Sequence, residues 1–330
     1  MEIQSVLSMA PLRISFLGGG TDISTYYTKS KGCVVSAAIN KYVYVHVKRH
    51  DPLFQERYRI SYSEVEHTNS RDSIKNSIVK GCLELLEIDE PIQISTSADL
   101  PSNSGLGSSS SFAVALLNAL HTLKNENASP VQLAEEASSV EIELLGSPIG
   151  KQDQYAAAFG GLNLFEFATD GRVSIEPINL SAVEVNALLD KSIMIWTGQS
   201  RNANLVLRDQ ADQANLNHEH LIELSNLAQD FKLKLLEKDV DWTSLGPLIK
   251  KGWSLKQSFS TKIATDEVMT ITGKLDSLGS VGYKLLGAGG GGFVFGVFGS
   301  KFKEIQTELK EWHTFQPCLD SQGARIVSVN

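Results

Sequence analysis

The sequence predicts an α+β protein with two domains. Its 330 residues exceed what a single hydrophobic core usually organises. Strand-like and helix-like segments are mixed up to about residue 185. Between residues 185 and 200 the pattern changes to amphipathic helices, and strands return near the C-terminus. We therefore expect an N-terminal domain over residues 1–187 and a C-terminal domain over residues 188–330.

The composition is that of a globular protein with a sizeable core, since 42% of the residues are hydrophobic and 21% are charged. The formal net charge of −8 argues against nucleic acid or an anionic membrane as a partner. An anionic small-molecule substrate would therefore need a local basic site.

The cysteines and the N-terminus indicate a reducing compartment. Cys33, Cys82 and Cys318 are too few and too far apart for a disulfide framework or a zinc site. The N-terminus carries Glu2 and no basic-then-apolar signal pattern, and no run of about 18 apolar residues occurs. We expect a cytoplasmic protein, either a monomer or a homodimer.

The first elements are a strand and a glycine turn. Residues 13–17 alternate like a strand and lead into Gly-Gly-Gly-Thr-Asp at 18–22. Three glycines permit close approach of the backbone to a ligand, Asp22 can accept hydrogen bonds from hydroxyls, and Arg13 supplies a permanent cation. The alternative is a hairpin turn closed by an Asx motif. Residues 33–47 predict one or two strands and residues 73–86 a helix.

Residues 101–111 read Pro-Ser-Asn-Ser-Gly-Leu-Gly-Ser-Ser-Ser-Ser, between a predicted strand at 92–98 and a predicted buried helix at 112–120. This order places Gly105, Gly107 and four hydroxyls at a helix N-terminus, where unpaired N–H groups and the helix dipole favour a phosphate. The alternative is a helix with redundant N-caps. No Lys-Ser/Thr follows the glycines, so the segment is not a Walker A loop.

The next helix carries an unexplained acid. Ser129 as N-cap and Pro130 at the first position mark its start, and Gly146 its end. Ala134, Ala137, Glu141 and Leu145 share one stripe, which places the Glu141 carboxylate on a small, apolar face. A cation is the simplest partner for such a carboxylate. The alternative is that Glu141 lies at the edge of the stripe with its head in water.

Polar residues at 150–155, Gly-Lys-Gln-Asp-Gln-Tyr, predict a functional loop or a short helix start, with Asp153 as an N-cap as the structural alternative. Strands are predicted at 162–167 and 192–196. The second is followed by Thr-Gly-Gln-Ser-Arg, whose Arg201 either clamps an anion or is simply exposed.

Amphipathic helices are predicted between residues 202 and 274, including 221–236 and 245–255. Strands at 282–286 and 293–297 flank the glycines at 287–292. These glycines fit GxGxxG as a string, but a strand follows them where a dinucleotide fingerprint needs a helix, so we reject a Rossmann motif. A last helix is predicted at 301–312 and a last strand at 325–329.

Three of these segments, in this order, resemble the GHMP small-molecule kinases, which include galactokinase, homoserine, mevalonate and phosphomevalonate kinases. Residues 11–22 are similar to the family's N-terminal substrate motif. Residues 101–111 match its Pro-x-x-x-Gly-Leu-Gly-Ser-Ser phosphate loop, and residues 284–292 resemble its C-terminal glycine motif. The resemblance covers nearly the whole chain. It implies an N-terminal ribosomal-protein-like α/β domain and a C-terminal ferredoxin-like α+β domain.

Within the family, residues 18–22, 150–157 and 197–201 most resemble the D-glycero-D-manno-heptose 7-phosphate kinases, with the kinase region of bacterial fucokinases next. Gly20 stands where galactokinase has histidine, which argues against galactose. Lys151 differs from the apolar residue of galactokinase, and the resemblance implies no role for it.

The resemblance implies roles residue by residue. Asp153 corresponds to the aspartate that acts on the sugar hydroxyl, and Arg13 to its basic partner. Ser109, with Ser108 as the alternative, and Glu141 correspond to ligands of Mg²⁺. The implied ATP-binding residues are Pro101, Ser104, Gly105, Leu106, Gly107, Ser108, Ser109 and Ser110. The implied substrate-binding residues are Gly19, Gly20, Thr21, Asp22, Arg201, Gly289 and Gly290. Of these, Arg201 is the candidate for a phosphate carried by the substrate.

The implied activity is transfer of the ATP γ-phosphoryl group to the anomeric hydroxyl of a sugar, with Mg²⁺, in carbohydrate metabolism and nucleotide-sugar biosynthesis. The expected substrate is D-glycero-D-manno-heptose 7-phosphate, and fucose or another hexose is the alternative. A second alternative is a non-catalytic sugar- or nucleotide-binding regulator, although Asp153, Glu141 and Arg13 together argue against it because a binder needs no base. A third, a dinucleotide enzyme using residues 287–292, predicts NAD binding.

Overall fold

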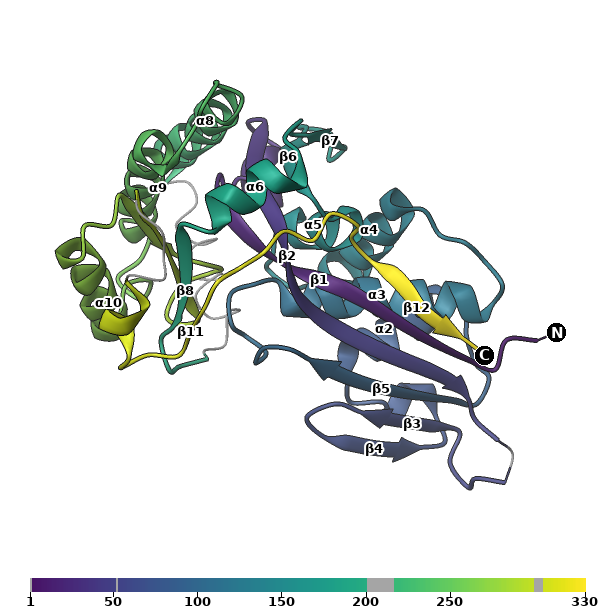
Figure 1. Cartoon of the computed structure of the whole chain (residues 1–330). Coiled ribbons are helices and arrows are strands. Elements are labelled where there is room, and N and C mark those ends of the chain that lie inside the picture. The colour runs from purple at the N-terminus through teal and green to yellow at the C-terminus, as the bar shows by residue number, and fades with distance from the viewer. Residues whose placement is uncertain (1, 52, 201–216, 300–304) are drawn as a thin grey trace.

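The computed structural model describes residues 2–51, 53–200, 217–299 and 305–330, which form two bodies, each built around a sheet (Figure 1). The strands are β1 (Ser5–Leu17), β2 (Gly32–Arg49), β3 (Tyr58–Ser61), β4 (Val65–Thr68), β5 (Ile92–Ala98), β6 (Leu162–Phe167), β7 (Val173–Pro177), β8 (Ser192–Trp196), β9 (Gly282–Leu285), β10 (Phe293–Val297), β11 (Thr314–Phe315) and β12 (Arg325–Val329). The α-helices are α1 (Ser24–Tyr27), α2 (Ser77–Leu85), α3 (Ser108–Leu123), α4 (Pro130–Ser138), α5 (Gln152–Phe159), α6 (Ala182–Leu189), α8 (His218–Leu235), α9 (Trp242–Gln257) and α10 (Asp266–Ser277). A π-helical segment, η2 (Ser139–Leu144), continues α4, and 3₁₀ turns occupy η1 (Arg71–Ser73) and η4 (Gln306–Leu309).

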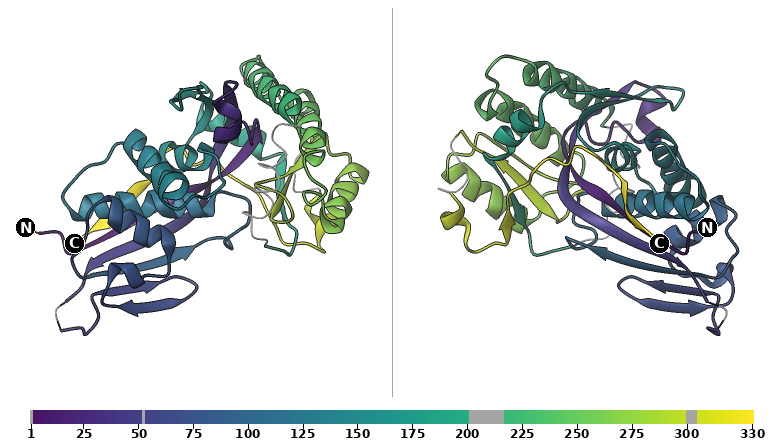
Figure 2. Two further views of the ribbon diagram at one scale, coloured as in Figure 1. Left: turned by 180° about the vertical axis from the view of Figure 1, so that it is seen from behind. Right: turned by 45° about the vertical axis from the view of Figure 1, so that its right-hand side comes forward.

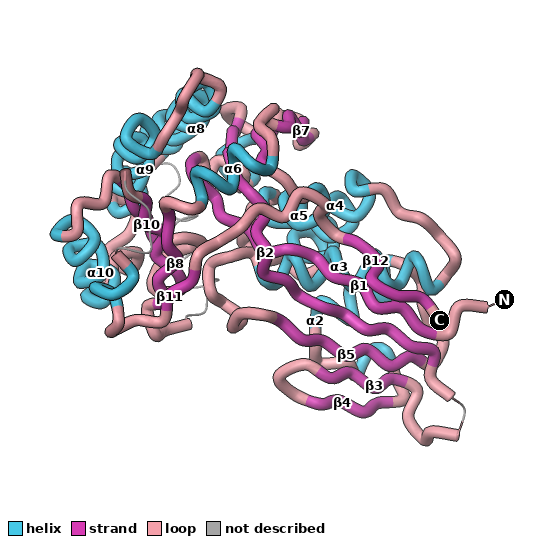
Figure 3. Tube along the Cα trace, viewed as in Figure 1, coloured by secondary structure: helices cyan, strands magenta, loops and turns pink. Residues whose placement is uncertain are grey.

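The larger sheet has the strand order β12-β1-β2-β5-β3-β4, with β6 and β7 attached through the first half of β2. Helices α2 to α5 lie on one of its faces, as the view from behind shows (Figure 2). The smaller sheet has the order β11-β8-β10-β9, and α8, α9 and α10 belong to the same body (Figure 3). Among the described helices, none combines the length and the apolar character needed to cross a membrane. This is the two-domain α+β arrangement that the sequence predicts.

The chain does not divide between the two sheets at one point. Strand β12 pairs antiparallel with the first half of β1, so the C-terminal strand lies in the larger sheet (Figure 1). The predicted division between residues 187 and 188 also falls inside α6. The division stays a prediction about domains, but residues 325–329 belong by their pairing to the N-terminal sheet. The pairing of strands so far apart in the chain cannot be predicted from the residues of either strand alone.

Most predicted elements are confirmed, and the differences have local causes. Strand β1 begins eight residues before the predicted start at 13, because Pro11 lies at a β-bulge and breaks the alternation. Helix α2 begins later than predicted, at Ser77, because the Asn76 side chain caps it by accepting from the Val79 amide (3.1 Å). Residues 33–47 lie in a single strand, β2. The predicted helix at 301–312 lies partly outside the described residues, and its described part contains the 3₁₀ turn η4.

An aromatic contact joins the two bodies. Phe16, near the end of β1, packs against Phe231 of α8, Trp242 of α9 and Phe295 of β10, with ring centroids 5.5, 6.0 and 5.7 Å away. All four side chains are buried. Burial of aromatic side chains is a large favourable contribution to association. This contact fixes the end of β1, and the glycine turn that follows it, against the C-terminal body.

The junction of α3 and α4 contains a buried histidine between two carboxylates. His121 Nδ1 lies 2.7 Å from Glu126 Oε2, and its Nε2 lies 2.7 Å from Glu136 Oε2. The hydrogen bond to Glu136, with that to Glu126, raises the pKa of His121 above its ordinary value although burial opposes this. The imidazolium form, which can donate from both nitrogens, is therefore favoured.

We expect His121→Gln to lower the free energy of unfolding by about 1.5–3 kcal/mol at pH 6. A histidine whose pKa is higher in the folded state contributes fully below its unfolded pKa of about 6.5, and this contribution is lost as the pH rises through the folded pKa. The difference between wild type and variant should therefore shrink toward pH 9. Urea unfolding at a series of pH values measures it. A constant difference from pH 6 to 9 would show that the charge is not what stabilises this junction.

Candidate active site

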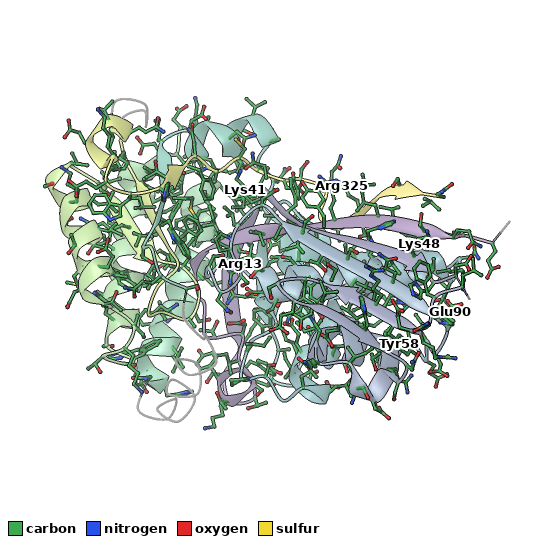
Figure 4. All side chains as sticks on the ribbon, turned by 90° about the horizontal axis from the view of Figure 1, so that it is seen from below. Arg13, Lys41, Lys48, Tyr58, Glu90 and Arg325 are labelled. Carbon is green, nitrogen blue, oxygen red and sulfur yellow. The ribbon has the colours of Figure 1, made fainter. Side chains whose placement is uncertain are left out.

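A cavity of about 140 Å³ lies between the phosphate-loop segment, the glycine turn after β1, the start of α5 and the C-terminal glycine loop. Its walls come from both bodies of the protein. Figure 4 places Arg13 in the middle of the molecule, where the two bodies meet. The predicted site residues at this cavity are Arg13, Gly19, Gly20, Asp22, Gly105, Gly107, Ser108, Ser109, Ser110 and Asp153.

The segment predicted to bind phosphate forms the connection from β5 to α3. Helix α3 begins at Ser108 after Gly107, which has φ of 79°. A Cβ on Gly107 would lie 3.2 Å from the Asp153 carboxyl carbon, and one on Gly105, where φ is 83°, would lie 2.5 Å from the Leu286 carbonyl oxygen. Only glycine fits both positions without strain. The first turn of α3 therefore meets the cavity, where its free N–H groups and the helix dipole favour an anion.

Both bodies hold this loop in place. The Arg13 amide donates to the Leu106 carbonyl oxygen, and the Phe293 amide donates to the Ser104 carbonyl oxygen, each at 3.1 Å.

Three of the predicted ATP-binding residues do not line the cavity. Leu106 is buried in the core and Pro101 is exposed, and neither lines the cavity. Ser104 is also buried, and its hydroxyl has no hydrogen-bond partner among the described residues. Leu106 and Ser104 anchor the loop through their carbonyl oxygens, while Gly105, Gly107 and the serines from 108 to 110 line the cavity.

Glu141 lies directly behind the serines, on η2. Its side chain is buried, and Oε2 accepts from Ser110 Oγ and Gln154 Nε2, both at 2.7 Å. Burial raises the pKa of Glu141, while hydrogen bonds from Ser110, Ser109 and Gln154 counter part of the rise. In the described part of the chain, no lysine, arginine or histidine lies within salt-bridge distance of it. The acid predicted from the helical stripe is thus buried with only neutral donors.

This set of oxygens fits a magnesium ion. Mg²⁺ is usually held by one or two carboxylates together with phosphate and water oxygens. Glu141 supplies one carboxylate, and Ser109 supplies a hydroxyl at the cavity. Over the residues that the structure describes, no group of three or more His, Cys, Asp and Glu gathers that could hold a metal ion, so an ion here would take its other ligands from phosphate and water. The buried, unpaired carboxylate is the observation that favours a cation here.

Asp153 and Arg13 form a two-point ion pair. Arg13 Nε and Nη2 lie 2.7 Å from Asp153 Oδ1 and Oδ2, and Arg13 Nη1 donates to the Gly105 carbonyl oxygen at 2.7 Å. Asp153 stands in the first turn of α5, whose N-cap is Lys151, so Asp153 is not the N-cap. The planar guanidinium therefore fixes the carboxylate of Asp153 and the phosphate loop relative to each other.

Asp22 forms the other acidic wall. Its Oδ1 accepts from the Gly20 amide (2.9 Å) and Gln152 Nε2 (3.2 Å), and its Oδ2 from the Gln152 amide (3.1 Å). Burial and the nearby Asp153 raise the pKa of Asp22. A Cβ on Gly150 would lie 1.9 Å from Asp22 Oδ2. Any residue other than glycine at position 150 would therefore displace the Asp22 carboxylate.

Two predicted substrate residues of the glycine segments serve the backbone instead. Thr21 is buried, and its hydroxyl donates to the Gly18 carbonyl oxygen (2.8 Å) and accepts from the Cys33 amide (3.0 Å). In the C-terminal loop, the Gly290 amide donates to the Ile263 carbonyl oxygen (3.0 Å).

Gly289 is another predicted substrate-binding residue of the C-terminal loop. It packs against Ile263, and a Cβ on Gly289 would lie 3.0 Å from Ile263 Cα. The cavity is lined two residues earlier, by Gly287 and Ala288. The glycine segment therefore borders the cavity through Gly287 and Ala288, and substrate binding by Gly289 and Gly290 stays a prediction. Arg201 lies outside the described residues.

Lys151 has a structural role that the sequence did not reveal. Its ammonium donates to the Gly171 carbonyl oxygen (2.9 Å) in the turn between β6 and β7, and lies 5.5 Å from the centre of the Tyr27 ring. A lysine here ties the β6–β7 turn to the start of the helix that carries Asp153.

Two lysines and a glutamine also line the cavity, and the sequence analysis gave none of them a role. Lys284 of β9 is buried and donates to the carbonyl oxygens of Ser15 (2.8 Å) and Phe16 (2.9 Å). Burial, with the positive charges of Lys256 and Arg13, holds the pKa of Lys284 well below its usual range. Lys256 of α9 reaches the same cavity.

Gln152 adjoins Asp153 in sequence and binds Asp22. Adjacency to Asp153 could have marked this glutamine, whereas nothing in the sequence marks Lys256.

Comparison with known proteins identifies the family. The model of the GHMP kinase N-terminal domain matches residues 77–161, and that of the GHMP kinase C-terminal domain matches residues 233–313. The D-glycero-alpha-D-manno-heptose 7-phosphate kinase of Campylobacter jejuni is 31% identical over 309 residues, covering 89% of each chain. A galactokinase of Pyrococcus furiosus is 26% identical, covering 86% of each.

Solved structures share the fold over the full length. A crystal structure of a D-glycero-D-manno-heptose 1-phosphate kinase from Bacteriodes thetaiotaomicron superposes with a TM-score of 0.78 at 25% identity, covering 98% of this chain and 99% of that one. A putative sugar kinase from Campylobacter jejuni gives a TM-score of 0.73 at 25% identity, covering 99% of both chains. With both family domains matched and a full-length relative above 30% identity, the chain belongs to the GHMP kinases.

Proposed function

We propose that the protein is a sugar 1-kinase that transfers the γ-phosphoryl group of ATP to the anomeric hydroxyl of D-glycero-D-manno-heptose 7-phosphate, giving the 1,7-bisphosphate. The similarity to heptose phosphate kinases in sequence and in structure supports this substrate class. The geometry of the cavity supports the reaction type.

One observation carries the proposal: Asp153 lies against the phosphate loop. The Asp153 carboxyl carbon is 3.2 Å from the place of a Cβ on Gly107, the N-cap residue of α3, and Arg13 binds both Asp153 and Gly105. A carboxylate in this position meets a hydroxyl that approaches a phosphate bound at the helix N-terminus. A protein that only binds sugar or nucleotide has no need of that carboxylate.

In the proposed reaction, the amides at the start of α3 and the serines from 108 to 110 hold the triphosphate. Asp153 accepts the proton of the anomeric hydroxyl as its oxygen forms a bond to the γ-phosphorus, while the bond from that phosphorus to the bridging oxygen breaks and ADP leaves. Arg13 orients Asp153, and Asp22 accepts hydrogen bonds from other sugar hydroxyls. Most of the catalysis is positioning and charge neutralisation, as is general for phosphoryl transfer.

Mg²⁺ is the metal that the site would hold, through Glu141 and the hydroxyl of Ser109. When bound, Mg²⁺ neutralises negative charge on the phosphate oxygens. Ser110 and Gln154 orient the Glu141 carboxylate through their hydrogen bonds.

A panel of acceptors with ATP and Mg²⁺ tests the function. We expect kcat/KM for D-glycero-D-manno-heptose 7-phosphate to exceed that for fucose, galactose or mannose by at least about 100-fold. The protein groups that bind the phosphate of the heptose would stay unpaired when an unphosphorylated sugar is bound. Phosphorus NMR of the product should show a new phosphomonoester at the anomeric position. A preference for fucose would change the substrate but keep the reaction. Binding of sugar and nucleotide without transfer to any acceptor would favour a regulator.

A further inference from the structure

Lys256 brings a cation from the C-terminal body to the proposed site of transfer. It stands near the end of α9, its side chain is half-buried and lines the cavity, and its ammonium donates to the carbonyl oxygen of Gly287. The phosphate loop contains no lysine, and Lys151 at the start of α5 donates to Gly171 and does not line the cavity. The proposed mechanism does not use Lys256.

The other two cavity cations are committed to the protein. Arg13 uses three nitrogens on Asp153 and Gly105, and Lys284 donates to two backbone carbonyl oxygens. An ammonium has three N–H donors. Lys256 gives one of them to Gly287, which is the acceptor it reaches among the residues that the structure describes. It therefore retains donors for a ligand in the cavity.

Lys256 lines the cavity together with residues of the phosphate loop and with both Asp22 and Asp153. Gly287 packs against the phosphate loop so tightly that a Cβ on it would lie 2.4 Å from Gly105 Cα. Gly105 is joined through Arg13 to Asp153, the proposed base for the acceptor hydroxyl. Asp22 and Asp153, on the side proposed for the acceptor, line the same cavity as Lys256, and their charges act on it. The group that passes between these two sides is the γ-phosphoryl group.

We propose that Lys256 binds the γ-phosphoryl group of ATP during its transfer, so that the C-terminal body supplies part of the positive charge that the transition state needs. This inference rests on the proposed function and adds a residue to its machinery. Lys256 is then a catalytic residue, because it touches the reacting group. A lone positive charge directed at the phosphoryl oxygens stabilises the charge that they carry in the transition state.

The surroundings of Lys256 make its charge responsive to a bound anion. Burial and the charge of Arg13 lower the pKa of Lys256 to about 8, although Asp22 and Asp153 oppose them. The charged groups that face it are Arg13 of β1, Asp22 of the glycine turn, Asp153 of α5 and Lys284 of β9. A phosphate bound beside the ammonium would raise its pKa again. Binding should then take up a proton near pH 8.5, where the phosphate itself is fully ionised.

The test compares binding of two nucleotides without any acceptor, so it is read independently of the sugar. In wild type, the non-hydrolysable analogue AMP-PNP with Mg²⁺ should bind more tightly than ADP with Mg²⁺ if the γ-group has its own partner. We expect Lys256→Met to reduce this preference about 10- to 100-fold and to leave ADP affinity within about twofold. Lys256→Arg should retain part of the preference, because it keeps the charge with a different geometry.

Lys251→Met on the same helix is the matched control, since Lys251 is exposed and pairs with Glu223. It should change neither affinity. Calorimetry at pH 8.5 in buffers of different ionisation enthalpy should show proton uptake with AMP-PNP in wild type and none in Lys256→Met. Thermal unfolding establishes that each variant is folded.

Three outcomes would overturn the inference. Equal loss of AMP-PNP and ADP affinity would assign Lys256 a general structural role. Unchanged binding of both nucleotides, with a higher KM only for phosphorylated sugars, would assign it to a phosphate carried by the acceptor. Unchanged binding and turnover would remove it from the site. If wild type discriminates between the nucleotides but phosphorylates no sugar, the proposed acceptor is wrong and the γ-phosphoryl contact stands.

Discussion

Asp153→Asn is expected to lower kcat about 10²- to 10⁴-fold, the usual cost of losing a general base. Asparagine has nearly the same shape and keeps one of the two oxygens that accept from Arg13, so the fold should persist while the proton acceptor disappears. The KM for ATP should change little, because Asp153 faces the acceptor side. Steady-state kinetics with the preferred sugar measures both quantities, and thermal unfolding reports the integrity of the fold.

Asp276→Asn is the control for this substitution. Asp276 is also an aspartate paired with a cation, Lys250, but it lies on α10 away from the cavity. This variant should keep wild-type kcat. If Asp153→Asn retained kcat within a few-fold while folded, Asp153 would be an orienting group and the base would have to be sought elsewhere.

The second large effect is expected at Glu141. Glu141→Gln should raise the Mg²⁺ concentration for half-maximal rate by about 10- to 100-fold, because the glutamine keeps acceptors for Ser110 and Gln154 but loses the negative charge. Titration of the rate with Mg²⁺ at saturating ATP measures this shift.

Glu143→Gln, on the same π-helical segment, provides the comparison. Glu143 is exposed, and its carboxylate accepts from Ser139 rather than from a residue of the cavity. It should leave the Mg²⁺ requirement unchanged. An unchanged requirement in Glu141→Gln as well would exclude Glu141 from the metal site, and the buried carboxylate would then need another explanation.

Local features of the site could be predicted well. The Ser129 cap, the glycines before α3 and the spacing that places Glu141 on a buried stripe are properties of neighbouring residues. The same holds for the strand after the C-terminal glycines, which excludes a dinucleotide fingerprint. N-cap chemistry, positive φ and helical periodicity act within a few residues, so the sequence displays them directly.

The sequence was less informative about residues whose role depends on a partner far away in the chain. Gly289 and Gly290 were chosen from the glycine string, yet Gly287 and Ala288 line the cavity, because the close packing of Gly287 on Gly105 sets which part of the loop faces it. Lys256 looks like any polar residue of an amphipathic helix. Periodicity tells which face of a helix is polar, but not whether that face meets water or a binding site.

The sequence alone therefore determined the order of most elements, the phosphate loop, the acid at 141 and the family resemblance. The tertiary structure decided which of these pieces meet. Arg13 and Asp153 pair across 140 residues, Lys284 reaches the end of β1 across 269 residues, and the C-terminal strand β12 returns to pair with β1. The physical reason is that such contacts depend on how whole sheets and helices pack, to which every buried residue contributes, whereas no short segment encodes its distant partner.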